Sequence, residues 1–578
     1  MRVIPILTIT DELNASPLDD TGPGSMKFSL IFRAFLILQL VVQGGATLFA
    51  EDALLPNRFM VSMEDGVHLA TDVYLPDGEK PESTEKSYPV ILLRSPYGKA
   101  FGPAVGVNFI KAGYALAVQD VRGRFDSEGN DAIVFFHEGR GETHDGHDTL
   151  RWLKDQKWCD GNVVTWGASA LGITQTMMAP GAPEVLKAQY AVVAFSDMYS
   201  QAAYQGGVWR KEMLDGWLPG NKFDPRSYEE FRAHTKYGDF WKVANAEIGA
   251  GDVQAPGIFR GGWYDIFAQG TINSFVTIQN QGQPGARGKC RLVMGPWAHG
   301  GFKELTYPEN SKTAGDVESA IRFYDYHARG KQNGVNEDKP VHYYVMGDPE
   351  VESALGNFWR KVESWPPPAD ETEFYFHKSG ELNSSAPETE ESLEYAYDPE
   401  NPVPTVGGQN LIISKGPRDQ REVESREDVL VFTTDTLTEP LEVTGRIKAK
   451  LYISSDCPDT DFTVKLCDVY PDGRSMLVTD GIMRARYRHS FEIPELLVPG
   501  QIYELEVDLW STSLIFNKGH QIRVAVSSSN DPRFEPNPNT GADHFQPGET
   551  KKIAHNRIYL APDSPSHIVL PIYSGAEE

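Results

Sequence analysis

The stretch that decides the fold is NVVTWGASALGITQ, residues 162–175, in which an apolar run meets a Gly-Ala-Ser turn and a helix-compatible segment. A strand that turns sharply into a helix at a serine is typical of the nucleophile elbow of α/β-hydrolases, whose motif is Gly-x-Ser-x-Gly. Gly167 and Ser169 fit this motif, but Leu171 holds the second glycine position and the glycine follows at Gly172. The turn is therefore either an elbow with altered spacing or a helix start capped by a serine.

The sequence around this turn predicts a parallel sheet with helices on both faces. Nearly continuous apolar runs separated by helical patterns are typical of such sheets, because both faces of each strand are buried. Between about 198 and 253 the pattern changes to aromatic-rich, helix-compatible sequence, which indicates a helical cap inserted between two strands. The apolar runs lie at 89–94, 114–120, 162–166, 188–195, 257–262 and 290–295.

The chain of 578 residues is too long for one compact core, so two or three domains are expected. A proline-rich passage, ESWPPPADET at 363–372, marks a boundary. Beyond it, alternating apolar and polar positions between Gly, Pro and Asp turns predict an antiparallel β-sandwich or jelly roll. We therefore expect an α/β-hydrolase domain at 51–355, which contains the cap, and a C-terminal all-β domain at 370–575.

Residues 26–50 have the layout of a secretory signal peptide, with Lys27, a mostly apolar core and small residues at the end. The apolar stretch at 34–42 is too short to span a membrane. The segment at 1–25 is polar and rich in turn residues, so we expect translation to start at Met26. We expect residues 1–50 to be an extension and signal, and the protein to be periplasmic or secreted, with no membrane attachment after signal removal.

The composition narrows the classes of function. The formal net charge is −27, from 81 acidic and 54 basic residues. Nucleic-acid binding is not expected, because phosphate contacts need clustered Lys and Arg and no basic tract is present. The four cysteines form no Cys-x-x-Cys pair, which argues against zinc or a redox dithiol. Cys457 and Cys467 could pair in an exported protein, but their spacing does not decide it. The oligomeric state is left open.

A serine, an aspartate and a histidine follow three of the predicted strands, in the chain order of α/β-hydrolases: Ser169, Asp265 and His299. The carboxyl ends of parallel strands face the ligand crevice. A serine hydroxyl needs an imidazole base, and a carboxylate must orient that imidazole. We expect the three residues to form a catalytic triad, with Asp197 as the alternative acid.

Acyl transfer also needs donors for the oxyanion. The backbone N–H of Ala170, at the start of the helix after Ser169, is one candidate. The hydroxyl of Tyr97, just after the first strong strand, is the other, although a tyrosine packed on the surface fits the sequence equally well.

Other polar clusters have structural explanations. Asp120, Arg122 and Asp126 are expected to form ion pairs in a loop beside the crevice, since buried charges need partners. The histidine-rich segment at 137–148 is interpreted as a polar loop and a capped helix start rather than a metal site. Neither a metal nor another cofactor is expected. The cap tryptophans could line an acyl pocket, but core packing is favoured for most of them: Trp209, Trp217 and Trp241.

Together these motifs resemble the cocaine-esterase-like (CocE/NonD) serine hydrolases, which are related to X-Pro dipeptidyl peptidases, glutaryl acylases and α-amino-acid ester hydrolases. The nucleophile motif of that family is Gly-x-Ser-Tyr-x-Gly, so the resemblance implies that a glycine at 172 is normal. It also implies an α/β-hydrolase domain with a helical cap and a C-terminal jelly roll. The motifs are RSPYGK (94–99), QDVRGRFDSEG (119–129), TWGASALG (165–172), GGWYD (261–265), GPWAH (295–299) and NPVPTVGG (401–408).

The resemblance assigns roles to the five candidate residues. It implies that Ser169 is the nucleophile, Asp265 the acid and His299 the base, with Tyr97 and the amide of Ala170 as oxyanion donors. The expected activity is metal-independent hydrolysis of a small-molecule ester or amide through an acyl-enzyme. X-Pro dipeptidyl-peptidase-like and glutaryl or β-lactam acylase activities are alternatives within enzymes. A non-catalytic binding protein is the alternative of another class.

This sequence departs from the family pattern at two places in the site. Ala170 replaces the usual tyrosine, which implies a roomier pocket wall and a bulkier acyl group. Ile266 and Phe267 stand where amino-acid ester hydrolases carry extra carboxylates, so a clamp for a substrate ammonium group is not expected. The distance in sequence from Ser169 to Asp265 is short, which indicates a reduced cap.

Overall fold

The computed structural model describes residues 55–312, 316–543, 548 and 550–575. The predicted signal peptide at 26–50 and the predicted start at Met26 lie outside these residues. None of the helices in the described ranges has the length and apolar character needed to cross a membrane.

A ten-stranded sheet forms the centre of the first domain, as the apolar runs predicted. The strands from β4 to β11 are parallel, and antiparallel strands close both edges. In spatial order they are β1 (Asn57–Ser62), β2 (His68–Tyr74), β4 (Ala115–Asp120), β3 (Tyr88–Ser95), β5 (Cys159–Ala168), β6 (Leu186–Val192), β9 (Gly257–Tyr264), β10 (Arg291–Ala298), β11 (Val341–Val345) and β12 (Phe358–Val362).

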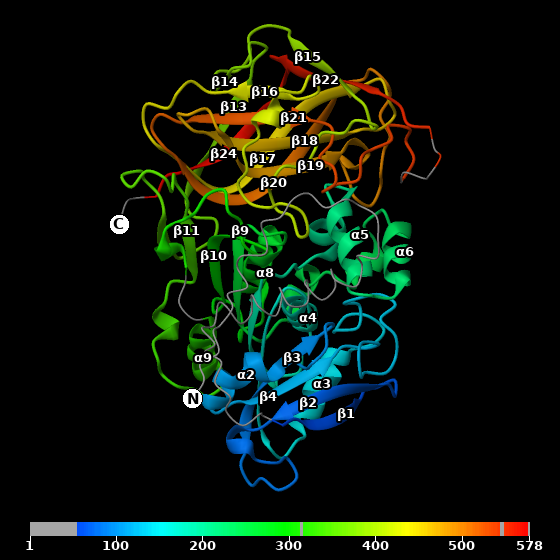
Figure 1. Cartoon of the computed structure of the whole chain (residues 1–578), viewed down its shortest axis with the longest axis vertical. Coiled ribbons are helices and arrows are strands. Elements are labelled where there is room, and N and C mark those ends of the chain that lie inside the picture. Colours follow the sequence, from blue (N-terminus) through cyan, green and yellow to red (C-terminus); the bar gives the residue numbers. More distant parts are fainter. Residues whose placement is uncertain (1–54, 313–315, 544–547, 549, 576–578) are drawn as a thin grey trace, which may run out of the picture.

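Helices cover both faces of this sheet (Figure 1). Ile91 and Leu93 of β3 pack in one core with α2 and α9, whereas Val90 and Leu92 pack in the opposite core with α3. Burial on both faces explains why this strand is apolar at successive positions. The helices of this domain outside the cap are α2 (Gly102–Lys111), α3 (Asp145–Lys154), α4 (Ala170–Met178), α8 (Ala268–Gln281) and α9 (Asp316–His327), with short turns η1 (Pro76–Gly78), η4 (Glu309–Ser311) and η5 (Val335–Glu337).

A cap lies between β6 and β9, where the sequence predicted one, and Figure 1 shows α5 and α6 at the side of the sheet. Its core is aromatic: Trp209, Trp241 and Phe231 are fully buried and pack together. Core packing is thus confirmed for two of the three cap tryptophans. The cap elements are η2 (Tyr199–Ala203), β7 (Tyr204–Gln205), β8 (Val208–Trp209), α5 (Lys211–Gly220), α6 (Pro225–Ala233), α7 (Asp239–Lys242) and η3 (Glu247–Asp252).

The C-terminal domain is built from antiparallel strands in two main sheets, drawn as the upper layer in Figure 1. Residues from both sheets, such as Ile447 and Val524, share one hydrophobic core. The larger sheet contains β14 (Leu382–Asn383), β13 (Ala369–Phe376), β24 (His567–Tyr573), β17 (Leu441–Ser455), β22 (Ala554–Ala561), β15 (Ser392–Tyr397), β20 (Tyr503–Phe516) and β23 (Ser564–Pro565). The smaller contains β16 (Leu430–Thr433), β21 (Gln521–Ser527), β18 (Asp461–Val469) and β19 (Ser475–Arg484), and short helices α10 (Arg421–Glu424) and η6 (Ala485–Tyr487) lie in its connections.

The change from one domain to the other falls at the proline-rich passage. β12 ends at Val362 in the first sheet, and β13 begins at Ala369 in the second domain. Backbone bonds also join the domains directly, because the N–H of Met346 donates to Ser513 at 3.0 Å and the N–H of Ile515 donates to Met346 at 2.8 Å. The two domains therefore share a continuous contact rather than a flexible linker alone.

The four cysteines are buried free thiols. Cys457 donates to the carbonyl oxygen of Ile553 at 3.7 Å, and Cys467 lies inside β18. The pairing of Cys457 with Cys467 that the sequence left open is thus absent from this structure.

Two partly buried histidines of the first domain predict acid sensitivity. Burial, reinforced by Arg291 and Lys289, lowers the pKa of His327 to about 4. Burial, reinforced by Lys361, also lowers the pKa of His342 to about 4. The unfolded chain therefore binds more protons between pH 4 and about 6.5, so the free energy of unfolding must fall as the pH is lowered through this window.

We expect the double variant His327→Gln, His342→Gln to lose part of this pH dependence, up to roughly 3 kcal/mol per histidine. Urea unfolding of both proteins at several pH values between 4 and 7 measures the difference. His489→Gln, at an exposed histidine, is the control. An unchanged dependence of the unfolding free energy on pH in the double variant would contradict the prediction.

Candidate active site

Ser169 lies at the turn between β5 and α4 with φ 55° and ψ −125°. Few residues other than glycine adopt positive φ, and the cost persists only where the surroundings enforce it. A strained strand-to-helix turn of this kind projects the serine hydroxyl from the edge of the sheet. The turn has the backbone geometry of a nucleophile elbow and not that of an ordinary capping serine, whose φ and ψ are extended.

Close packing explains the glycine spacing around Ser169. A Cβ on Gly172 would lie 2.9 Å from the carbonyl oxygen of Val192 and 3.1 Å from Cβ of Ala194, so only glycine lets α4 approach β6 this closely. A Cβ on Gly167 would lie 2.5 Å from Cβ of Leu171. Leu171 itself points into the core, which is why a glycine is not needed at that position.

The structure brings Ser169, Asp265 and His299 together. Ser169 Oγ lies 3.0 Å from His299 Nε2, and His299 Nδ1 lies 2.8 Å from Asp265 Oδ2. Asp265 is completely buried, and its other carboxylate oxygen accepts the backbone N–H of Phe267 at 2.8 Å. This arrangement can move a proton from the hydroxyl to the imidazole while the fixed carboxylate stabilises the resulting imidazolium.

Asp197, the alternative acid, is engaged elsewhere. Its carboxylate accepts the hydroxyl of Ser200 at 2.5 Å and the backbone N–H of Tyr199 at 3.2 Å. Burial raises the pKa of Asp197 to about 6, against opposing hydrogen bonds from Ser200. These bonds stabilise the start of the cap, and the structure pairs Asp265, not Asp197, with His299.

Tyr97 and Ala170 are the two donor candidates. The hydroxyl of Tyr97 accepts the indole N–H of Trp217 at 2.9 Å, which leaves its own O–H proton available to another acceptor. Burial raises the pKa of Tyr97 to about 12, so the phenol stays protonated at neutral pH. Ala170 is the first residue of α4, and an N–H at that position has no partner within its helix.

Aromatic side chains form a continuous row beside these groups. The ring of Phe267 meets the imidazole of His299 edge-on at 5.8 Å, and Phe195 packs against Phe267 at 5.2 Å. Phe135 packs against Phe195 at 5.8 Å and stacks on Trp217 at 6.0 Å. The row places apolar surface beside the polar groups, and hydrogen bonds are stronger where the local dielectric is low.

The charged residues of the 119–129 loop form the ion pairs expected of them. Lys99 pairs with Asp120 at 3.0 Å and with Asp126 at 2.5 Å. Arg122 pairs with Asp145 at 2.6 Å. In the histidine-rich segment, His137 bonds Thr143 at 2.7 Å and His147 bonds the carbonyl oxygen of Met178 at 2.8 Å. The capped helix start expected in this segment is wrong, because His144, at the N-cap position of α3, makes no side-chain capping bond.

Two contacts at the site carried no signal in the sequence. The sequence indicates that Trp217 lines an acyl pocket or packs in the core of the cap, and the structure adds a hydrogen bond from its indole to Tyr97. Lys415, from the C-terminal domain, donates to the backbone carbonyl of His299 at 2.7 Å. Each pair joins residues more than a hundred positions apart, so no local pattern could reveal it.

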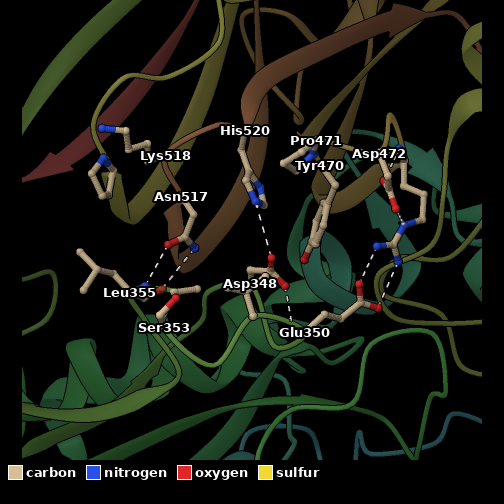
Figure 2. Close-up of a pocket in the computed structure, with 14 residues that line it drawn as sticks. Asp348, Glu350, Ser353, Leu355, Tyr470, Pro471, Asp472, Asn517, Lys518 and His520 are labelled. Carbon is tan, nitrogen blue, oxygen red and sulfur yellow. Dashed lines mark hydrogen bonds and ion pairs between the residues drawn. The ribbon is translucent and has the colours of Figure 1, made fainter.

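A cavity of about 460 Å³ lies apart from these residues, where the loop after β11 meets two turns of the C-terminal domain (Figure 2). His520 is buried there, with Nδ1 2.8 Å from Asp468 and Nε2 3.7 Å from Asp348. Glu350 pairs with Arg474 at 2.5 Å. His520 and Arg474 thus each face a carboxylate of the loop after β11, and the lining of the cavity includes no residue of the Ser169 site.

Known proteins resemble this chain along most of its length. A model of the X-Pro dipeptidyl-peptidase (S15 family) matches residues 65–222 and 218–301, and a model of the X-Pro dipeptidyl-peptidase C-terminal non-catalytic domain matches residues 333–569. The cocaine esterase of Rhodococcus sp. (strain MB1 Bresler) is 35% identical, and the alignment covers 89% of this chain and 98% of the esterase.

Two further similarities extend over both domains. A putative serine esterase of Mycobacterium bovis (strain ATCC BAA-935 / AF2122/97) is 26% identical, and the alignment covers 89% of this chain and 94% of that esterase. The solved structure of an α-amino acid ester hydrolase superposes with a TM-score of 0.74, covering 92% of this chain and 98% of that chain. The two sequences are 25% identical.

Removal of the Tyr97 hydroxyl tests its role as a donor. Loss of one oxyanion donor lowers kcat by about 100-fold or more, so we expect Tyr97→Phe to reduce kcat for a p-nitrophenyl ester to this extent with little change in KM. Steady-state kinetics of both proteins give the comparison, with Tyr375→Phe on β13 as the control. A variant with native kcat would show that the hydroxyl has only a packing role.

Proposed function

The chain belongs to the cocaine-esterase-like (CocE/NonD) family of serine hydrolases, and we propose that it cleaves an ester or amide through an acyl-enzyme formed on Ser169. Membership of this family makes the chain a serine hydrolase of ester or peptide bonds. The observation that carries the finer proposal is the pair of contacts at His299, 3.0 Å to Ser169 Oγ and 2.8 Å to Asp265 Oδ2.

The first half of the reaction forms the acyl-enzyme. Ser169 Oγ attacks the acyl carbon while its proton passes to Nε2 of His299. Asp265 stabilises the imidazolium, and the tetrahedral oxyanion accepts the hydroxyl of Tyr97 and the N–H of Ala170. The imidazolium then returns the proton to the leaving oxygen or nitrogen as the bond to the acyl carbon breaks.

Hydrolysis of the acyl-enzyme repeats these steps with water. His299 removes a proton from water as the water oxygen attacks the acyl carbon, and the same two donors stabilise the second oxyanion. The proton returns to Ser169 Oγ as the acid departs. No group besides these side chains and water is needed to balance the reaction.

An apolar and bulky acyl group is the substrate class that we propose. The aromatic row from Trp217 to Phe267 supports an apolar acyl group. Ala170, at the position where the family motif has a tyrosine, is buried beside this row. Its small side chain supports a bulky acyl group. Ile266 and Phe267 carry no charge, so the residues next to Asp265 offer no carboxylate to a substrate ammonium group.

Export is a further part of the proposal. It is supported by the signal-like layout of residues 26–50 alone. Amino-terminal sequencing of the protein recovered from outside the cytoplasm tests it, with a mature end close to Glu51 expected. Recovery of the full-length chain from the cytoplasm would contradict it.

A fluorophosphonate probe tests the proposed nucleophile. We expect the native protein to be labelled on Ser169, and the folded Ser169→Ala variant to remain unlabelled and to lose hydrolysis of p-nitrophenyl esters by a factor of roughly 10⁶. Ser490→Ala, at a serine of the C-terminal domain, is the control. Labelling of Ser169→Ala, or no labelling of folded native protein, would overturn the mechanism.

The size of the residue at 170 tests the proposed acyl specificity. A tyrosine ring in place of the methyl group of Ala170 would occupy the space that we propose for the acyl group. We therefore expect Ala170→Tyr to lower kcat/KM for arylacyl esters by about 10-fold or more relative to acetyl esters. A series of p-nitrophenyl esters, with amino-acyl and X-Pro anilides added, gives these ratios. Equal effects on small and large acyl groups would contradict the proposal, and preferential cleavage of X-Pro anilides would favour a peptidase.

A further inference from the structure

The loop at 407–418 of the C-terminal domain packs against the chain that follows His299. Gly416 approaches the ring of Phe302 so closely that a Cβ on it would lie 2.6 Å from the ring. Arg418 pairs with Glu304 at 2.5 Å. The residues after the histidine are thus held by the second domain, both by packing and by an ion pair.

The 407–418 loop is rigid by its own hydrogen bonds. The backbone N–H of Gly408 donates to Gly416 at 2.8 Å, and the N–H of Gly416 donates to Gly408 at 2.9 Å. The side-chain amide of Asn410 donates to Gly407 and to Ser414, both at 2.7 Å. Backbone and side-chain bonds across the loop fix its shape and therefore the position of any side chain that it carries.

The cap anchors the other side of the same loop. The carboxylate of Glu212, on α5, accepts the backbone N–H of Leu411 at 2.6 Å and of Ile412 at 2.8 Å. Arg210, fully buried, donates to the carbonyl oxygens of Gln409 at 3.1 Å and of Ile266, next to Asp265, at 3.0 Å. The loop therefore joins the cap to the segments that carry the acid and the base.

Lys415 makes the contact with the histidine itself. Its ammonium group donates to the backbone carbonyl of His299 at 2.7 Å and to that of Leu411 at 2.9 Å. Burial lowers the pKa of Lys415, and the charges of Glu212 and Asp265 oppose that shift. An ammonium group leaves bulk water at a cost, and charge-assisted bonds to two carbonyls offset it.

His299 lies directly after the end of β10 at Ala298. The chain turns tightly there, with the N–H of Gly300 donating to the carbonyl of Ala298 at 2.7 Å and Gly300 at φ 109°. The carbonyl of His299 projects from this turn and is the group that Lys415 holds. A shift or rotation at this peptide would move the imidazole relative to Ser169 Oγ.

We propose that Lys415 is a positioning residue that holds His299 in register with Ser169 and Asp265, so that the C-terminal domain contributes directly to the hydrolase site. This role rests on the proposed function of His299 as the base. A displacement of a catalytic group by about 1 Å can lower the rate up to 100-fold, so loss of the bond between Lys415 and His299 must lower kcat. Substrate affinity should change little, since Lys415 acts through the histidine backbone.

Two variants of Lys415 and one control variant test the proposal in the full-length protein. Lys415→Met keeps the length of the side chain without the donor, and we expect kcat to fall roughly 10- to 100-fold with KM nearly unchanged. Lys415→Arg restores a cationic donor and should recover most of kcat. Lys465→Met is the matched control, because this buried lysine bonds Gln420 within its own domain at 3.0 Å and should affect only thermal stability.

A second readout is independent of any substrate. We expect the proton between His299 Nδ1 and Asp265 to give a low-field resonance in the proton NMR spectrum of the native protein. Lys415→Met should move or broaden this resonance, and Lys465→Met should leave it unchanged. Native kcat in Lys415→Met, an equal loss in Lys465→Met, or an unchanged resonance would overturn the positioning role. If the native protein neither hydrolyses esters nor reacts with fluorophosphonate, the proposed function fails. The resonance still shows whether Lys415 holds His299 in its position beside Asp265.

Discussion

The backbone of Ser169, held at φ 55°, is the constraint on which the site depends. An unconstrained serine would avoid this conformation, so its surroundings must enforce it. Gly172 permits α4 to pack on the end of β6, and Gly167 permits the chain to fold back over Leu171. With the turn fixed in this way, the hydroxyl is aimed at His299 and the first N–H of α4 is left without a helix partner.

The sheet determines which other residues can meet Ser169. β9 and β10 are adjacent parallel strands, so Asp265 and His299, each just after its strand, lie 2.8 Å apart. β6 lies between β5 and β9, and its following residues lead into the cap, where Asp197 bonds Ser200.

Hydrogen bonds join the two domains at this edge of the sheet. Arg210, Glu212 and Lys415 connect the cap, the acid segment and the base segment through backbone carbonyl and N–H groups. Bonds to backbone groups fix the path of the chain and do not require particular side chains on the residues they hold. Lys415 of the C-terminal domain thus reaches the Ser169 site through the backbone carbonyl of His299.

Much of the fold and the order of the candidate residues could be predicted from the sequence, because burial on both faces gives apolar runs and a strand-to-helix turn gives a local motif. Ser169, Asp265 and His299 each stand directly after such a run. The positions of the residues alone left Asp197 as an alternative to Asp265, which the family resemblance favoured, and the structure pairs His299 with Asp265. The contact of Lys415 with His299 had no signal in the sequence, because it depends on which distant segments meet. The sequence by itself determined the sheet, the turn and the residue types that follow the strands, since these depend on neighbouring residues. Only the tertiary structure decided which of the residues after the strands contact one another, because those contacts join segments far apart in the chain.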